Sequence, residues 1–410
     1  MYEWLIVGGG PIGVHVAAAL RMQAGLPRGS VGIVDPEPTL MASWNRRAAA
    51  VGMTHLRSPS VHHVDVDPWS LQRFAEDWTP TDAQPAFAPP YSRPSTALFA
   101  AHSAAVIERL GLSGVHHCVR VEALGAAPEG WTADCSDGAS LRARRVVLAL
   151  GSSGTERIVP WARSFIADPE RWLQHVFDPR FDLDLRPQLE RVAVIGGGIS
   201  AVQVANRLAS QGRRVTIVTP HRLRRSQFDS SPQWLGPAKM AGFSRVDDLA
   251  TRRRMIDRAR RPGTITRDVE RTLRAHRQAG RIDVVVERVR GVYALPGRRV
   301  LGLSTELEVD AVALATGFSG MPTLPRFEGL AEDALPRARC GTPVVDAQLQ
   351  WARALYVTGA LAELQLGPIA RNIAGGRRAA ERLVPLAARE LRASVSGISP
   401  CAPARCSAGG

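Results

Sequence analysis

Two glycine-rich turns constrain the fold of this chain more than any other feature. The first lies in WLIVGGGPIGVHVAAAL, between an apolar run and a helix pattern of small residues, and its spaced glycines are Gly8, Gly10 and Gly13. In a strand, turn and helix of this kind, the first glycine permits a tight turn and the second lets the backbone approach a pyrophosphate. The third allows close helix packing, and the helix N-terminus offers free N–H groups to a phosphate. The stretch therefore predicts a dinucleotide-binding unit.

A second apolar run, VGIVD, follows the first turn and ends in Asp35, 22 residues after Gly13. A carboxylate at that strand end accepts hydrogen bonds from a ribose 2′-hydroxyl, whereas it repels a 2′-phosphate. Asp35 therefore favours a dinucleotide that lacks the 2′-phosphate.

The second turn, VAVIGGGISAVQVA, repeats the spacing at Gly196, Gly198 and Ala201. Its following run, RVTIVT, ends in Thr219 rather than in an acid, and a basic cluster comes next: His221, Arg222, Arg224 and Arg225. The cluster stands where the 2′-phosphate of NADP would lie. We interpret it as a phosphate site, the alternative being a solvated basic loop.

The similarity of the two halves extends beyond the turns. Residues 121–151 and 289–317 each read as short alternating strands before one buried apolar strand that ends in glycine. ALYVTGALAE, residues 354–363, reads as another core strand, and residues 367–383 read as a helix that begins near Gly367 and Pro368. We expect an α/β fold with two Rossmann-like nucleotide-binding domains, the second inserted into the first.

The predicted boundaries follow from this nesting. Residues 1–165 and 310–395 form the discontinuous first domain, residues 189–309 form the inserted domain, and residues 166–188 form a linker. Residues 396–410, which contain Cys401 and Cys406, are rich in Ser, Gly, Ala and Pro and predict a disordered tail. A redox role for that cysteine pair is a minor alternative.

Composition excludes several classes of function. The net charge is +14, but the basic residues are spread along the chain and Lys239 is the only lysine. No groove-reading helix or aromatic RNA platform accompanies them, so we expect no nucleic-acid partner. No apolar run approaches the ~18 residues that span a bilayer. Because the chain begins directly with a strand and a glycine turn, we expect a cytoplasmic protein without a membrane partner.

Two further patterns argue against metal and disulfide chemistry. The five cysteines show no C-x-x-C spacing and no disulfide framework. The one dense histidine and aspartate cluster, VHHVDVD at residues 61–67, alternates between faces if extended. We interpret it as a turn before a helix in which Asp67 is the N-cap and Pro68 the first helical residue. No metal site is expected.

The acidic strand end, the nested second turn and the A-T-G strand before a C-terminal strand and helix together resemble the flavoproteins with two dinucleotide-binding domains. The resemblance covers about residues 1–390. It implies that the first turn holds FAD and that the inserted domain holds NADPH. The further FAD contacts that it implies are Pro11, Trp44, Met53, Gly359, Gly367 and Pro368, and the further NADPH contacts are Thr219, Thr316 and Gly317.

Within that superfamily, DAVALATGF at residues 310–318 resembles the D-x-x-x-L-A-T-G-[FY] motif of the class B flavin monooxygenases. The closest group is the N-hydroxylating lysine and ornithine monooxygenases. Three segments are similar to theirs: SWNRRAAAVGMTHLRSP, PYSRPSTALFAAH and FDSSPQWLGP. The resemblance implies a substrate cleft that contains Arg57, Arg93 and Ser231. For Trp44, Arg57 and Arg93 the alternative is ordinary packing or a surface salt bridge.

Several features of the relatives are missing. The fingerprint F-x-G-x-x-x-H-x-x-x-[WY] of Baeyer–Villiger monooxygenases is absent, although His175 stands in the corresponding linker. Residues 259–273 lack the Asn-Tyr pair by which ornithine hydroxylases hold the amino-acid end of their substrate, and ELQLGPIARN replaces their Thr-His-Gly segment. Ornithine and lysine are therefore not the expected substrates. Residues 36–60 and 189–308 contain no cysteine, which excludes the thiol relay of the disulfide reductases.

These features predict an FAD- and NADPH-dependent monooxygenase that acts on a small molecule and O₂. The resemblance implies that one oxygen atom passes to a soft nucleophile through a flavin C4a-peroxide. N-hydroxylation of an amine is the favoured reaction, S-oxygenation stays open, and no protein catalytic base is assigned. The alternative is an NAD(P)H-dependent flavin reductase that passes electrons to a quinone or a protein. An FAD-binding scaffold without activity is a weaker alternative.

Overall fold

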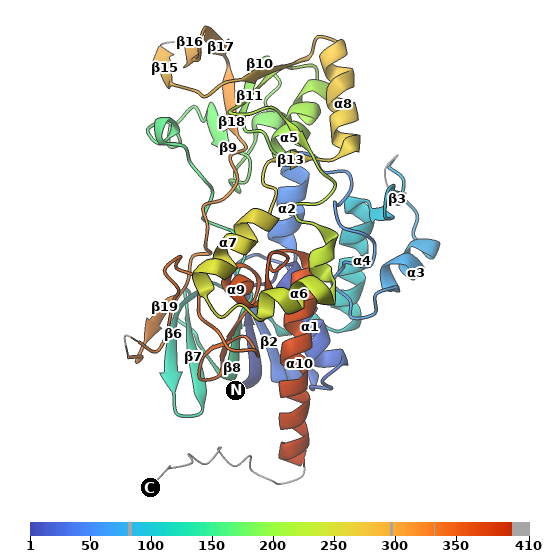
Figure 1. The fold of residues 1–410 in the computed structure, drawn as a ribbon, viewed down its shortest axis with the longest axis vertical. Helices are drawn as coiled ribbons and strands as arrows, with labels where there is room; N and C mark the ends of the chain where they lie inside the picture. The colour runs from blue at the N-terminus through green and yellow to red at the C-terminus, as the bar shows by residue number, and fades with distance from the viewer. Residues whose placement is uncertain (81–83, 296–297, 332, 396–410) are drawn as a thin grey trace.

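The computed structural model describes residues 1–80, 84–295, 298–331 and 333–395, and it consists of two bodies, each built on a sheet (Figure 1). The first body contains the N-terminal strand and the last helix, and the second occupies the upper part of the view in Figure 1. The chain crosses from the first body to the second and returns, as the predicted nesting requires. The predicted tail, with Cys401 and Cys406, lies outside the described residues.

The first sheet is built around β1. Its strand order is β19-β6-β7-β8-β1-β2-β5, while β21 pairs with β8 and β20 with β21. β1 pairs in parallel with β2 and β8, and Ile6 lies opposite Ile33 and Val147. All three side chains are fully buried, as expected for a parallel sheet covered on both faces. Its strands are β1 Tyr2–Val7, β2 Val31–Asp35, β5 His116–Cys118, β6 Val121–Ala127, β7 Gly130–Cys135, β8 Ser140–Leu148, β19 Arg326–Glu328, β20 Gln350–Ala352 and β21 Leu355–Val357.

The second sheet is parallel throughout, with the order β14-β11-β10-β18-β9. Its strands are β9 Leu173–His175, β10 Arg191–Ile195, β11 Arg214–Thr219, β14 Ile282–Val286 and β18 Ala311–Leu314. A separate antiparallel sheet consists of β15 Gly291–Leu295, β16 Arg298–Gly302 and β17 Glu306–Val309. Each body thus has the expected set of short strands before a buried apolar strand.

Two strands of the second sheet contradict the predicted domain boundaries. β9 lies inside the predicted linker 166–188, and β18 lies inside the segment 310–395 that was assigned to the first domain. β9 has only three residues, and the polar Gln174 and His175 hide its strand pattern. β18 owes its place to pairing with β10 and β9, which no local pattern reveals.

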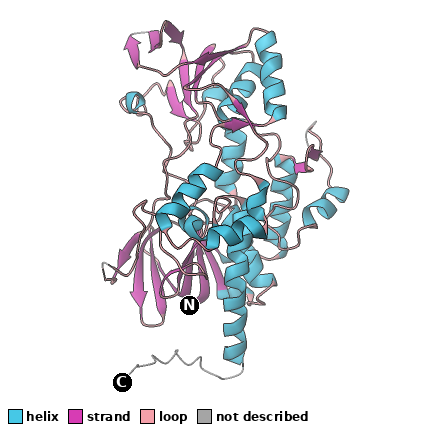
Figure 2. Ribbon diagram, in the orientation of Figure 1, coloured by secondary structure: helices cyan, strands magenta, loops and turns pink. Residues whose placement is uncertain are grey.

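Helices pack on one face of the second sheet, and its other face packs on residues 158–172 and the antiparallel sheet, while helices lie along the first sheet (Figure 2). α1 packs along α10 in the first body, and α5 packs on α8 in the second. Both α1 and α5 follow a glycine turn, with Gly10 and Gly198 as their N-caps. The helices are α1 Pro11–Met22, α2 Ala42–Val51, α3 Ser70–Asp77, α4 Thr96–Arg109, α5 Ile199–Ser210, α6 Pro237–Ser244, α7 Leu249–Ala259, α8 Arg267–Gln278, α9 Glu363–Leu366 and α10 Ile373–Val395. None of the helices in the described ranges is long and apolar enough to cross a membrane.

The last helix begins later than predicted. α10 starts at Ile373, not near Gly367 and Pro368, and it continues past Pro385. Gly367 has a φ of +77° and ends α9, because the left-handed region suits glycine at a helix C-terminus. The residues between the two helices form a turn, so Pro368 precedes α10 rather than opening it.

A long excursion, residues 226–263, leaves the second body between β12 (Arg224–Arg225) and β13 (Thr264–Ile265). It contains α6 and α7, which lie beside α9 in Figure 1. Its apolar side chains pack on those of the C-terminal segment, in a cluster made of Trp234, Met240, Phe243, Ile256, Leu364 and Ile369. The excursion therefore joins the two bodies.

A buried carboxylate fixes the same junction. Glu363 is 1% exposed and forms ion pairs with Arg253 and Arg260 of the excursion. Arg371, which precedes α10, donates from Nε to Glu363 Oε2 over 2.8 Å. Three cations around one desolvated carboxylate replace the hydration that Glu363 loses on burial.

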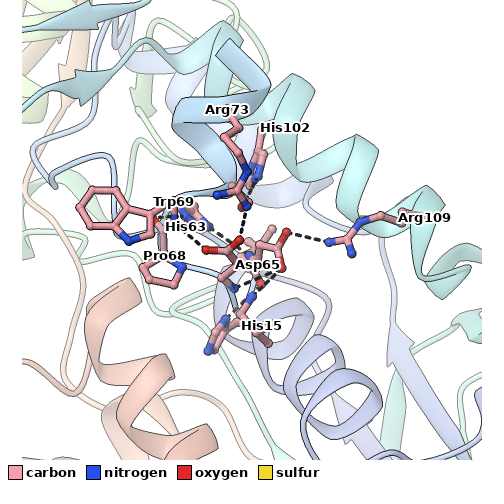
Figure 3. A network of polar contacts seen from close by, with 12 residues as sticks. His15, His63, Asp65, Pro68, Trp69, Arg73, His102 and Arg109 are labelled. Carbon is pink, nitrogen blue, oxygen red and sulfur yellow. Dashed lines mark hydrogen bonds and ion pairs between the residues drawn. The ribbon is translucent and has the colours of Figure 1, made fainter. Parts of the chain in front are cut away.

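The histidine-rich turn at residues 61–67 packs among α1, α3 and α4 (Figure 3). α3 begins at Ser70 rather than at Pro68, and Asp67 accepts a hydrogen bond from the Trp69 N–H in the turn before it. Within the described part of the chain, no three His, Cys, Asp or Glu residues are grouped so that they could hold a metal ion.

Candidate functional site

A cavity of about 1290 Å³ runs from the first glycine turn to the excursion. Both bodies line it: Gly8, Gly10 and Asp35 come from the first, and Phe228 and Asp229 come from the excursion. Its volume suits a large ligand such as a dinucleotide, and residues from both bodies form its wall.

The first turn has the geometry that a phosphate cradle requires. Gly8 has a φ of +120°, and a Cβ there would lie 2.4 Å from Ala149 O. A Cβ at Gly13 would lie 1.8 Å from Gly8 O, so the turn and α1 pack too closely for any side chain. At Gly10, by contrast, a Cβ would meet no atom within 4 Å. The backbone is thus open to the cavity at the position where the sequence predicts a pyrophosphate.

Asp35 stands at the carboxyl end of β2 and lines the cavity. Its Oδ2 accepts a hydrogen bond from Gly9 N over 2.6 Å, and its Oδ1 accepts one from Glu37 N over 2.9 Å. The carboxylate is therefore oriented beside the turn, where a ribose hydroxyl of a dinucleotide bound at α1 would lie.

The structure brings together most of the residues assigned to FAD. Those that line the cavity are Gly8, Gly10, Pro11, Asp35, Trp44 and Met53. Gly13 lies within the turn itself, whereas Gly359, Gly367 and Pro368 are not among the lining residues. Because α10 begins later than predicted, Asn372, Ile373 and Ala374 take their place at the cavity wall.

The second turn repeats the backbone geometry of the first turn, but its middle glycine does not face open space. Gly196 has a φ of +146°, and a Cβ there would lie 2.4 Å from Ala315 O. A Cβ at Gly198 would meet Gly263 Cα at 3.5 Å, so the end of the excursion lies across this turn. Ala201 is buried in α5, and Thr219 is buried at the end of β11, where its Oγ1 donates to His221 O.

The basic cluster is exposed, but its members differ in their partners. Arg224 donates to Pro262 O over 3.0 Å, and Arg225 forms an ion pair with Glu270 at 3.5 Å. Arg222 is also exposed. Arg224 and Arg225 thus contact other groups of the protein, and Arg222 is exposed.

Thr316 and Gly317 lie where the two crossings between the bodies pair with each other. Arg157 N donates to Gly317 O over 2.8 Å, and Thr316 Oγ1 donates to Arg157 O. Glu156 and Phe318 form an antiparallel bridge beside them. This pairing places both residues on a two-stranded connection between the bodies.

The three residues predicted to lie in the substrate cleft occupy different places in the structure. Arg57 and Ser231 line the cavity, but Arg93 does not. Arg93 is 1% exposed and donates to Leu56 O, to Pro89 O and to Asp268, whose Oδ2 lies 3.1 Å from Nη2. The prediction of Arg93 as a cleft residue is therefore wrong, and the salt-bridge alternative holds.

Sequence reasoning missed several residues at the excursion end of the cavity. Tyr91 and Phe228 face each other with ring centroids 5.2 Å apart. Asp229, Leu235 and Asn372 complete this end of the wall. The segment FDSSP carried the only local signal, because the contact between residues 91 and 228 depends on how the two bodies meet.

Burial keeps the imidazoles at the cavity uncharged. Desolvation lowers the pKa of His62, which lines the cavity, to about 4. It also lowers to about 4 the pKa of His175, which does not line the cavity but contacts the ring of Phe177, which does. At neutral pH both histidines are therefore neutral, and arginines supply the positive charge at the cavity.

Comparisons with known proteins agree with this geometry. The family model of FAD-NAD(P)-binding proteins matches residues 5–153, and that of the pyridine nucleotide-disulphide oxidoreductases matches residues 93–233. No curated protein matches the chain significantly.

Several solved structures share the fold over nearly the whole chain. The reduced ornithine hydroxylase of Pseudomonas aeruginosa is 18% identical with a TM-score of 0.74, and the match covers 95% of this chain and 100% of that one. The L-lysine 6-monooxygenase of Pseudomonas syringae is 20% identical, with a TM-score of 0.72 and coverages of 95% and 99%. The FAD-bound cadaverine monooxygenase of Erwinia amylovora is 13% identical, with a TM-score of 0.71 and coverages of 100% and 99%. At these identities the likeness establishes the fold.

Proposed function

From the premise that this chain is an FAD/NAD(P)-binding flavoprotein with the fold of the N-hydroxylating flavin monooxygenases, we propose that it is an NADPH-dependent monooxygenase of small-molecule amines. The observation that carries the proposal is the single cavity that joins the cradle at Gly10 to the excursion. In such a cavity a small substrate can lie next to a bound dinucleotide, so that no protein thiol is needed to carry electrons between them. None of the residues that line it is a cysteine, so the chemistry of a disulfide reductase has no thiols there.

The first turn fits FAD. Gly10 leaves room for a pyrophosphate at the N-terminus of α1, and Asp35 offers a carboxylate to a ribose. Trp44 and Met53 supply apolar walls, and the backbone of residues 372–374 completes the pocket. When bound, FAD supplies hydride acceptance and O₂ activation, and the protein supplies binding, orientation and a dry site.

The inserted domain would hold NADPH. Gly196 and Gly198 provide the turn before α5, and the missing acid after β11 leaves a 2′-phosphate unopposed. Arg222 and Arg224 are exposed near the end of β11, where they can contact that phosphate. Because an arginine fork binds phosphate by charge-assisted hydrogen bonds, this arrangement supports NADPH over NADH.

The proposed reaction consumes an amine, O₂, NADPH and a proton. One oxygen atom enters an N–H bond to give a hydroxylamine, the other leaves as water, and NADPH supplies the two electrons. Oxygenation of a sulfur would follow the same balance. Asp229, Tyr91 and Phe228 stand at the end of the cavity that such a substrate would occupy.

Product mass in the presence of ¹⁸O₂ tests the proposal. We expect purified, FAD-loaded protein to oxidise NADPH faster than NADH, and an amine product to gain one ¹⁸O atom. If NADPH consumption instead gives only H₂O₂ across a panel of amines and thioethers, the proposal that the protein is a monooxygenase is wrong. Reduction of a quinone under those conditions would establish the reductase in its place.

A further inference from the structure

The excursion end of the cavity differs in charge from a site for an amino acid. An amino-acid substrate brings a carboxylate, which a partly buried site must match with a cation or leave unpaired at a cost. Two arginines line this end, Arg57 and Arg371. What each guanidinium already holds therefore decides what the cavity can accept.

Both guanidinium groups are engaged by the protein. Arg57 donates from Nε to Gln227 O over 3.0 Å, and from Nη2 to Ser226 O over 2.9 Å. Arg371 donates from Nε and Nη2 to Glu363, and from Nη1 to Gly320 O over 3.0 Å. Neither arginine presents an open two-nitrogen face to a carboxylate.

One acid at this end has the opposite character. Asp229 lines the cavity, and among the described residues no cation lies within ion-pair distance of its carboxylate, although its charge acts on the guanidinium groups of Arg57 and Arg260. Its Oδ1 accepts only a 3.3 Å hydrogen bond from Asn372 Nδ2, and its own carbonyl accepts from Arg261 N. The backbone thus holds the residue in place, while the carboxylate keeps acceptor capacity for a cation.

The neighbouring wall is apolar. Tyr91 is 58% exposed although it is aromatic, and it packs on Phe228. Leu235 is 37% exposed at the same rim. Exposed aromatic and aliphatic side chains beside a cavity favour a ligand with an apolar body. When such a ligand binds, its own apolar surface and that of the side chains are both removed from water.

We propose that the substrate is a primary amine with an aromatic or alkyl body and no carboxylate. Asp229 binds its amino group as the ammonium ion, whose proton passes to water before the nitrogen accepts oxygen, and Tyr91, Phe228 and Leu235 contact its body. The inference rests on the proposed monooxygenase function and narrows its substrate class, since it separates apolar amines from amino acids such as ornithine.

A comparison of three amines tests the substrate class. FAD-loaded protein is supplied with NADPH, ¹⁸O₂ and either 2-phenylethylamine, hexylamine or L-ornithine, and kcat/KM is measured from the ¹⁸O-labelled product. We expect both carboxylate-free amines to exceed ornithine by about tenfold or more. A tenfold preference for ornithine would overturn the inference and leave the monooxygenase intact. If none of the amines gains oxygen, the proposed function itself is wrong.

Two variants test the residues. Asp229→Asn keeps the shape and removes the charge, and we expect KM for 2-phenylethylamine to rise about tenfold with a smaller change in kcat. Tyr91→Ala should raise KM for 2-phenylethylamine more than for propylamine, which is too short to cover the ring. Glu76→Gln changes an exposed carboxylate on α3 and serves as the matched control. An unchanged KM in Asp229→Asn, with normal FAD content, would refute the role of Asp229.

Discussion

Glycines only two or three residues apart in the first turn serve different purposes. A Cβ at Gly13 would collide with Gly8 O at 1.8 Å, whereas a Cβ at Gly10 would project into open space. Gly10 also has a φ of −78°, which any residue adopts. Packing therefore requires a glycine at position 13, whereas only the bound ligand requires one at position 10.

This difference predicts opposite outcomes for two small substitutions. Gly10→Ala should fold with an almost unchanged melting temperature but bind FAD about tenfold more weakly, because its methyl group occupies the pyrophosphate position. Gly13→Ala should lower the melting temperature of the apoprotein or prevent folding, since backbone must move. Differential scanning fluorimetry and flavin titration of both variants make the measurement. Equal FAD affinity in Gly10→Ala and the parent would contradict the assignment.

Arg93 illustrates a charge that acts in packing. Its side chain is 2% exposed and its Nη2 lies 3.1 Å from Asp268, which is 27% exposed. We expect Arg93→Met to reduce the free energy of unfolding by about 3 kcal/mol, since it leaves Asp268 without its cation. The double variant Arg93→Met with Asp268→Asn should recover part of the loss. Urea titration of the three variants checks this, and a loss that is the same with and without Asp268 would exclude the pair as its cause.

At the scale of elements, the strands and turns with local signatures were predictable. The glycine turns and β1, β2, β10 and β11 follow from spacing and apolar runs within a few residues. β9 and the first residue of α10 could not be predicted in this way, because each depends on contacts with residues that are distant in sequence. Gly367 ends α9 instead of starting a helix, and β9 exists only as an edge strand on β18. Arg93 was misplaced for the same reason, since Asp268 lies on another body.

Three buried histidines connect α1, the turn at residues 61–67 and α4 (Figure 3). Burial lowers the pKa of His15 and of His102 to about 4, and that of His63 to about 3. The charged groups around them are Asp65, Asp67, Arg73, Arg109 and Arg377. Near neutral pH the three imidazoles are uncharged, so the three elements pack without a charged histidine between them.

The pH dependence of stability follows from these values. Between pH 6.5 and about 4 these histidines are protonated in the unfolded chain but remain neutral in the folded protein. Because the unfolded state binds more protons, the free energy of unfolding falls as the pH falls through this window. His15 alone should account for a loss on the order of 3 kcal/mol, at about 1.4 kcal/mol for each pKa unit. Urea unfolding at pH 7.5, 6 and 5 measures the slope. His15→Gln, which does not titrate, should reduce the slope by the contribution of one histidine while the others keep theirs, and an identical slope in that variant would refute the assignment.

At the scale of the whole molecule, the excursion makes the two bodies act as one. It starts and ends in the second body, yet its apolar side chains and its arginines contact Glu363 and the C-terminal segment of the first. The excursion end of the cavity lies at this junction, so its shape depends on both bodies. Sequence patterns predicted each half of the site separately, but not the meeting of Tyr91 with Phe228.

Segment 261–264 at the end of the excursion contacts two places at once. Gly263 lies across the second turn, while Arg261 N donates to Asp229 O over 2.6 Å and Thr264 Oγ1 accepts from Arg57 over 3.2 Å. Gly263 thus lies in van der Waals range of the second turn, and the same short segment hydrogen-bonds to Asp229 and Arg57.

If NADP⁺ binds at the second turn and an amine binds beside Asp229, as proposed, the shared segment predicts a thermodynamic linkage between the two ligands. Whatever factor NADP⁺ imposes on the dissociation constant of the amine, the amine must impose on that of NADP⁺. We expect a factor of about five or more, measured by calorimetric titration of each ligand with and without the other. Asp229→Asn keeps the backbone contact and should preserve the factor, whereas independent binding in the parent protein would refute the linkage.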